Sequence, residues 1–225
     1  MSKKEKPQPG RRHGPDLALR DEVAVSNADV VLEGNPLEDA CLRDAEFAGK
    51  KLASFRATRS HIVQVSFTGV EAGSFRVRDT RFEKCDFANA VLRGMRAERV
   101  DFIDCRLVGF RAIECSWQDV LLQSCDLRYC QLTDGKLQHC EFKSSHMADA
   151  DFRRADLECA LFSDVVLRRA DITGGGLNGT DLRGADIEDL IAAASDLYGA
   201  IVSPAQAMGL ARLLNIDIRW KCRNS

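Results

Sequence analysis

Apolar residues recur at every fifth position of the chain, from Leu32 to Val202, without one break in register. An amphipathic helix buries a side chain about every 3.6 positions and a half-buried strand every second one, so a period of five fits neither element. The intervening positions are rich in Asp, Arg, Glu, Ser and Gly, which favour water. The 35 apolar positions therefore predict a repeat protein in which each five-residue unit contributes a central side chain to one continuous core.

A second inward position lies two residues before each central one. It is usually small, most often Ala, Cys or Val, and where it is large the central residue is usually small. The clearest cases are Phe55 with Ala57, Met95 with Ala97, Phe110 with Ala112 and Leu190 with Ala192. Such trading of volume is expected where both side chains fill a narrow, close-packed interior, because voids and overpacking both destabilise.

Several units match a known repeat. The segments 150–154 (ADFRR), 155–157 (ADL), 170–172 (ADI) and 180–184 (TDLRG) resemble the A(D/N)LXX unit of the pentapeptide-repeat family. The resemblance implies an all-β fold, a right-handed quadrilateral β-helix in which four units make one square coil. Thirty-five units would give about nine coils stacked about 4.8 Å apart.

The two ends of the chain differ from the repeat. We expect residues 1–15 to be a disordered basic tail, 16–27 an N-terminal cap, 28–204 the β-helix, and 205–225 a C-terminal helix and short strand. Ser203 is a predicted N-cap, with Pro204 in the first turn. An apolar stripe then predicts a cap or a homodimer contact, formed by Met208, Leu210, Leu213, Leu214 and Trp220. In the strand, Ile216, Ile218 and Trp220 would alternate.

Charge is divided unevenly along the chain. The ends carry +4 (residues 1–20) and +3 (residues 203–225), which leaves −9 for residues 21–202. One basic cluster stands out when coils are stacked: Arg56, Arg76 and Arg96 fall in one column, with Arg78 beside them. This column predicts a contact patch for an acidic partner or a phosphate backbone. The alternative is a solvated face whose arginines lie over exposed backbone and reach the flanking Asp79 and Glu98.

Nine cysteines without a CxxC pair argue against a zinc knuckle and against a thioredoxin-type redox site. Stacking places Cys85, Cys105 and Cys125 in one inward column. Three sulfurs in a line cannot give zinc a tetrahedral shell, so we interpret them as small hydrophobic side chains. Cys159 and Cys222, like Cys41, fall on outward positions.

The sequence argues against an enzyme and implies no cofactor and no metal. Its four histidines, of which one lies in the tail, fall on different faces, and no Ser or Cys is placed beside a His and an acid. No apolar run is long enough to cross a bilayer and no targeting segment is visible, so a cytoplasmic location without membrane contact is expected.

Two binding hypotheses follow. The first is a scaffold or adaptor, either with an unknown protein partner or binding an acidic partner or nucleic acid through the arginine column. The second follows the resemblance to the quinolone-resistance branch of the family. It implies a DNA-mimicking, homodimeric rod that modulates DNA gyrase or topoisomerase IV. The chain departs from that branch in two ways. Its acidic residues are spread among basic ones rather than collected on one face, and its unbroken register leaves no room for the projecting loops of some members.

Overall fold

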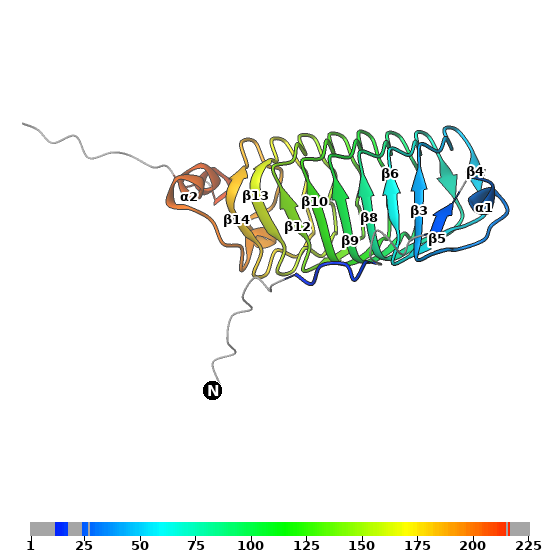
Figure 1. The fold of residues 1–225 in the computed structure, drawn as a ribbon. Coiled ribbons are helices and arrows are strands. Elements are labelled where there is room, and N and C mark those ends of the chain that lie inside the picture. Colours follow the sequence, from blue (N-terminus) through cyan, green and yellow to red (C-terminus); the bar gives the residue numbers. More distant parts are fainter. Residues whose placement is uncertain (1–11, 18–23, 27, 215, 217–225) are drawn as a thin grey trace, which may run out of the picture.

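The computed structural model describes residues 12–17, 24–26, 28–214 and 216, and shows one elongated coil of short strands (Figure 1). The strands are β1 (Ala24–Ser26), β2 (Leu37–Glu38), β3 (Ala40–Arg43), β4 (Lys51–Leu52), β5 (Phe55–Thr58), β6 (His61–Val63), β7 (Glu71–Ala72), β8 (Phe75–Glu83), β9 (Arg96–Ile103), β10 (Ser116–Gln123), β11 (Lys136–Gln138), β12 (Glu141–Lys143), β13 (Leu161–Val166) and β14 (Asp181–Asp186). The helices are α1 (Ala28–Leu32) and α2 (Pro204–Leu210), with 3-10 turns at Ala194–Leu197 and Ala211–Leu214.

Successive coils pair in parallel with a register of 20 residues. Val77 lies between Ala57 and Ala97, and the next face repeats the arrangement with Phe82 paired to Phe102. Four five-residue units therefore make one turn, as predicted, and the chain winds as a right-handed coil (Figure 1). The buried central positions, from Leu37 to Ile187, fill about eight turns rather than the nine expected. Between β13 and β14 the register shifts, where Gly184 approaches the preceding rung so closely that an added Cβ would lie 2.8 Å from the Phe162 carbonyl oxygen.

The corners of the coil require a left-handed backbone. Among the described residues, φ is positive at 22 non-glycine residues and eight glycines, and all of these lie two positions after a central residue. This conformation costs most L-residues about 1–2 kcal/mol, whereas Gly, Asn and Asp tolerate it best. The requirement explains why Asp recurs at this position, for example at Asp79, Asp119 and Asp149.

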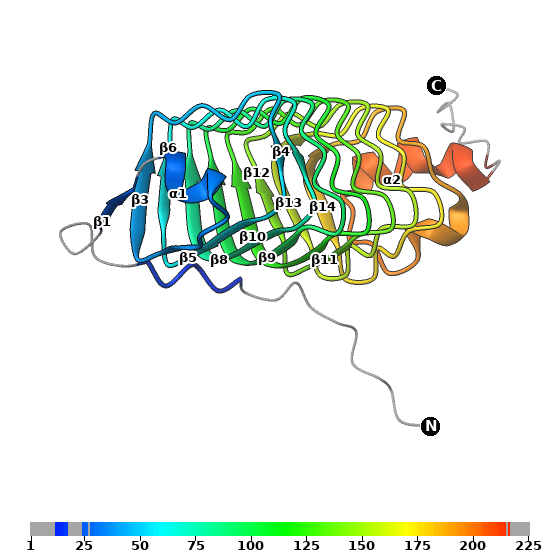
Figure 2. The ribbon, with the colours of Figure 1, turned by 90° about the vertical axis from the view of Figure 1, so that its right-hand side faces the viewer.

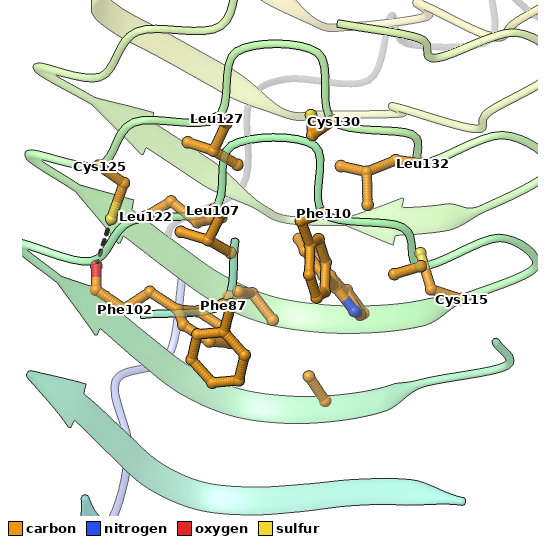
Figure 3. Close-up of a cluster of buried hydrophobic side chains, with 14 of the residues drawn as sticks. Phe87, Phe102, Leu107, Phe110, Cys115, Leu122, Cys125, Leu127, Cys130 and Leu132 are labelled. Carbon is orange, nitrogen blue, oxygen red and sulfur yellow. Dashed lines mark hydrogen bonds between the residues drawn. The ribbon is translucent and has the colours of Figure 1, made fainter. Parts of the chain in front are cut away.

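Phenylalanine side chains stack along the interior. Phe82 lies on Phe102 with ring centroids 4.9 Å apart. Phe87 meets Phe102 edge-on at 5.8 Å (Figure 3). The Cys125 thiol donates to the Phe102 carbonyl at 3.4 Å, so a small polar group is satisfied inside the core (Figure 3). The two predicted inward rows are thus buried, and they form one hydrophobic core along the rod.

Three expectations need correction. The first unit is not part of the coil, because residues 28–32 form α1 and Leu32 is 45% exposed. Residues 12–15 lie against the solenoid, so the predicted disordered tail is wrong there, since Arg12 finds buried carboxyl and carbonyl partners. Cys159, expected at the surface, is buried at a corner of the coil, with 8% of its surface exposed.

The C-terminal helix begins where the sequence predicts. Ser203 caps α2, its hydroxyl accepting from the Gln206 amide at 3.3 Å, and Pro204 opens the first turn. The Gln206 side chain also donates to two carbonyls of the last full coil, at 2.7 and 2.8 Å. These bonds satisfy exposed ladder groups, so α2 covers part of the open end of the solenoid. Within the described residues, no helix is long and apolar enough to cross a membrane.

Candidate functional site

Four parallel strands align arginine side chains on one outer face. β5, β8, β9 and β10 pair Arg56 with Arg76, Arg76 with Arg96, and Arg96 with Ser116. A second row runs beside it, two residues further along each strand, and a shallow groove of about 340 Å³ lies between them. We call this the arginine groove; its lining comprises Arg56, Ala57, Thr58, Arg76, Val77, Arg78, Arg96, Ala97, Glu98, Ser116 and Gln118.

The positive charge of the arginine groove is only partly neutralised. Arg78 lies 3.5 Å from Asp79 and 3.6 Å from Glu98, and Arg56 donates to the Gly34 carbonyl at 3.1 Å. Arg76 and Arg96 are exposed and form no ion pair with another described residue. The solvated-face alternative therefore describes Arg78, which reaches carboxylates, and Arg56, which reaches a backbone carbonyl. It does not describe Arg76 and Arg96.

A corner column beside the groove alternates in charge. The Arg99 guanidinium holds both oxygens of Asp79, at 2.7 and 2.8 Å, and also contacts Glu98. Burial opposes ionisation of Asp79, but hydrogen bonds from Arg99 and from the Asp16 amide outweigh it, so the pKa of Asp79 is lowered. Two rungs closer to the N-terminal end of the coil, Arg59 binds Asp39 at 2.7 Å. These arginines are neutralised, in contrast to Arg76 and Arg96.

Residues 12–17, which we call the N-terminal strap, run along this corner across successive rungs (Figures 1 and 2). Arg12 donates to the Asp101 carboxylate at 2.8 Å and to the Asp119 carbonyl at 3.1 Å. The His13 amide donates to the Asp119 carboxylate at 3.1 Å, and the Asp16 amide to Asp79 at 3.0 Å. No sequence pattern predicts this contact, because it joins residues about ninety positions apart.

Many acidic residues elsewhere on the rod pair with a basic side chain. Asp134 pairs with Arg154 of the next coil at 2.6 Å, and Asp149 with Arg169 at 2.7 Å. Further pairs are Asp126 with Arg128, Asp151 with Arg153, Asp181 with Arg183 and Asp186 with Arg168. These carboxylates are therefore neutralised by neighbouring arginines and do not form a row of free negative charge.

These pairs predict the acid sensitivity of the fold. The pKa is lowered in the folded chain for Asp79, Asp126, Asp134, Asp149, Asp151, Asp181 and Asp186. A group whose folded pKa lies below its unfolded value stabilises the fold above the unfolded value and loses that contribution as pH falls. We expect the melting temperature by circular dichroism to be flat from about pH 7 to 5 and to fall progressively below about pH 4. A melting temperature that rises on acidification would contradict this assignment.

The remaining candidates from the sequence lie apart from the groove. Burial raises the pKa of the Cys115 thiol to about 12 and also raises that of Cys105. A hydrogen bond with the Cys105 side chain, together with burial, raises the pKa of Cys85, so these thiols stay protonated. No group of three or more potential metal ligands occurs among the described residues. At the C-terminal end, Met208 is 47% exposed, whereas Leu210 and Leu213 are half-buried. The Leu214 side chain and Trp220 lie outside the described part of the chain, as does Ile218. Ile216 is 53% exposed and is not in a strand.

Comparisons with known proteins agree with the coil. Sequence models of a pentapeptide repeat region and of pentapeptide repeats (8 copies) match residues 75–152 and 150–189. Trypsin-treated QnrB1, a plasmid-mediated fluoroquinolone resistance protein, is 20% identical with a TM-score of 0.39, covering 83% of this chain and 91% of its own. HetL, a pentapeptide repeat protein involved in heterocyst differentiation regulation from the cyanobacterium Nostoc sp. strain PCC 7120, is 18% identical with a TM-score of 0.39, covering 74% and 86%. No curated protein matches the chain.

Proposed function

We propose that this chain, which belongs to the pentapeptide-repeat family, is a non-enzymatic adaptor whose arginine groove binds an acidic segment of a partner protein. The observation that carries the proposal is the pair Arg76 and Arg96, two exposed guanidinium groups on adjacent rungs with no ion partner in the described chain. Like charges held one rung apart repel, and an acidic ligand relieves the repulsion. The rest of the rod supplies a rigid frame that fixes their spacing.

The groove favours a protein segment over nucleic acid. The groove contains four arginines and one carboxylate, but residues 21–202, which include the groove, carry a net charge of −9. A short acidic segment meets mainly the local positive field, whereas a long polyanion also meets the negative field of the flanking faces. An acidic peptide is therefore the better match in size and charge.

Modulation of DNA gyrase or topoisomerase IV by a DNA-like rod is the second candidate. The acidic body and the extended shape favour it. The pairing of acids with arginines, as in Asp134 with Arg154, lowers its support, because a DNA mimic presents unpaired negative charge. A purified chain that neither binds gyrase nor alters supercoiling at low salt would eliminate this candidate.

Fluorescence anisotropy with a labelled deca-glutamate peptide tests the adaptor proposal. We expect saturable binding at about 50 mM NaCl that weakens at about 500 mM, because ionic contacts are screened. A serine–glycine peptide of the same length serves as the control and should not bind. Tighter binding of a short DNA duplex than of the peptide would replace the acidic-protein proposal with a nucleic-acid one, and no binding of either would refute the groove as a site.

The homodimer predicted from the sequence stays a prediction, and the end of the rod indicates how to test it. Three large apolar side chains of the C-terminal coil and α2 are exposed: Tyr198 by 82%, Ile191 by 50% and Met208 by 47%. If two copies pair through this end, Tyr198→Arg combined with Met208→Arg should convert the dimer to a monomer in sedimentation equilibrium, because two charges would be buried in the contact. A wild-type chain that sediments as a monomer at all concentrations would exclude the dimer.

A further inference from the structure

The N-terminal strap matches the spacing of the corner beneath it. Its amides at His13 and Asp16 reach Asp119 and Asp79, two carboxylates that lie two rungs apart. Two rungs span about 10 Å, and three extended residues span about the same distance. The carboxylates of this column lie on every second rung, so an extended chain laid along the rod axis can contact successive carboxylates with every third amide.

Arg12 is the anchor of the strap. Its side chain is 12% exposed, and it lies against Asp101, whose side chain is 3% exposed. One guanidinium group donates to the Asp101 carboxylate and to the Asp119 carbonyl at once, which uses the planar fork of arginine. Charge-assisted bonds of this kind are stronger than neutral ones and favour arginine over lysine.

We propose that this corner, the acidic trough formed by Asp79, Asp101 and Asp119, is a binding site for an extended arginine-containing segment of a partner protein. The N-terminal strap occupies it in the free chain as a tethered competitor that the partner displaces. The trough takes a basic ligand and the arginine groove an acidic one, so the two sites recognise different partners and the proposals stand or fall separately.

The trough is built to persist when the strap leaves. Asp101 keeps Arg81, at 2.8 and 3.2 Å, and Asp79 keeps Arg99. Asp119 differs. Among the described residues, its carboxylate accepts a hydrogen bond from the His13 amide of the strap and from no other group. Release therefore leaves Asp119 without that donor, and an incoming basic segment restores it.

The strap is also held lightly enough to be exchanged. Its backbone pairs with no strand, and His13, Gly14 and Asp16 are exposed. The described polar contacts with the rod are four hydrogen bonds, three of them to carboxylates. Its hold on the trough comes from tethering, which raises its effective concentration, and a free segment competes by mass action.

Isothermal titration calorimetry on the full chain tests the proposal. The probe is a capped peptide with the sequence of residues 8–17, QPGRRHGPDL. The chain carrying Arg12→Glu should bind it at least about tenfold more tightly than the wild type, because the reversed charge frees the trough from its own strap. Adding Asp101→Asn to that chain should weaken binding by at least about tenfold, whereas the matched change Asp134→Asn, on another face, should not.

A second measurement needs no variant. In the wild-type chain, the Asp16 amide should exchange with deuterium more slowly than in the free peptide, and an excess of peptide should accelerate it. Equal peptide affinity for the wild-type and Arg12→Glu chains, or an Asp16 amide that exchanges as fast as in the free peptide, would overturn the proposal. A probe peptide with Ala in place of Arg12 should bind to neither chain, and binding equal to that of the arginine peptide would also overturn it.

Discussion

Replacing Phe82 by alanine is expected to lower the free energy of unfolding by about 3–5 kcal/mol. The ring is fully buried, stacks on Phe102 at 4.9 Å and meets Phe87 at 5.3 Å. Its removal leaves a cavity that the neighbouring coils cannot fill, because ladder hydrogen bonds fix the distance between rungs. Phe82→Ala should therefore lie at the upper end of the range for core truncations.

Chemical denaturation followed by circular dichroism measures this loss, with Tyr129→Ala as the matched control. Tyr129 is 58% exposed, so its truncation should change stability by less than about 0.5 kcal/mol. Coincident transitions by two probes are required, since a solenoid can unfold in segments. A Phe82→Ala chain as stable as the Tyr129→Ala chain would contradict the stacked core.

Reversing Arg76 and Arg96 to glutamate together is expected to weaken deca-glutamate binding by about a hundredfold or more, roughly 2.7 kcal/mol. The two side chains lie on adjacent rungs and have no ion partner in the described chain, so their charge is available to a ligand. Reversal removes two attractions and adds two repulsions at the centre of the arginine groove. The affinity at low salt, measured by fluorescence anisotropy, checks this result.

The control for this reversal carries Arg153→Glu and Arg168→Glu. It makes the same change in net charge, but the arginines lie on other faces and are paired with Asp151 and Asp186. Its affinity for the probe should stay within about threefold of wild type, because distant exposed charges are screened. Equal losses in both double variants would mean that net charge alone attracts the probe, and that the groove is not a specific site.

The fold follows closely from the sequence because its rule is local. Each five-residue unit places one central side chain inward, and every central position from Leu37 to Ile187 is buried. The cap signal at Ser203 and Pro204 is local as well, and α2 begins there. The period breaks down at Leu32, where apolar character alone cannot distinguish the last residue of α1 from the first residue of a coil.

The candidate site was only partly predictable. Stacking in steps of 20 places Arg56, Arg76 and Arg96 in one column, and the structure adds the groove and the lack of ion partners. The contact of Arg12 with Asp101 could not be predicted, since the tail carries no apolar pattern and its partners are distant in sequence. The burial of Asp119 and Cys159 could not be predicted either, because their positions in the repeat are outward ones.

The unbroken 20-residue register restricts how such a chain can change length. One residue inserted into a coil would move every later inward side chain to a corner or an outer face, unless a bulge such as that between β13 and β14 absorbs it. Deleting or duplicating a whole turn preserves every assignment. Evolution can therefore shorten or extend this rod most easily in steps of one rung, which shifts the distance between its ends while leaving the spacing of Arg76 and Arg96 untouched.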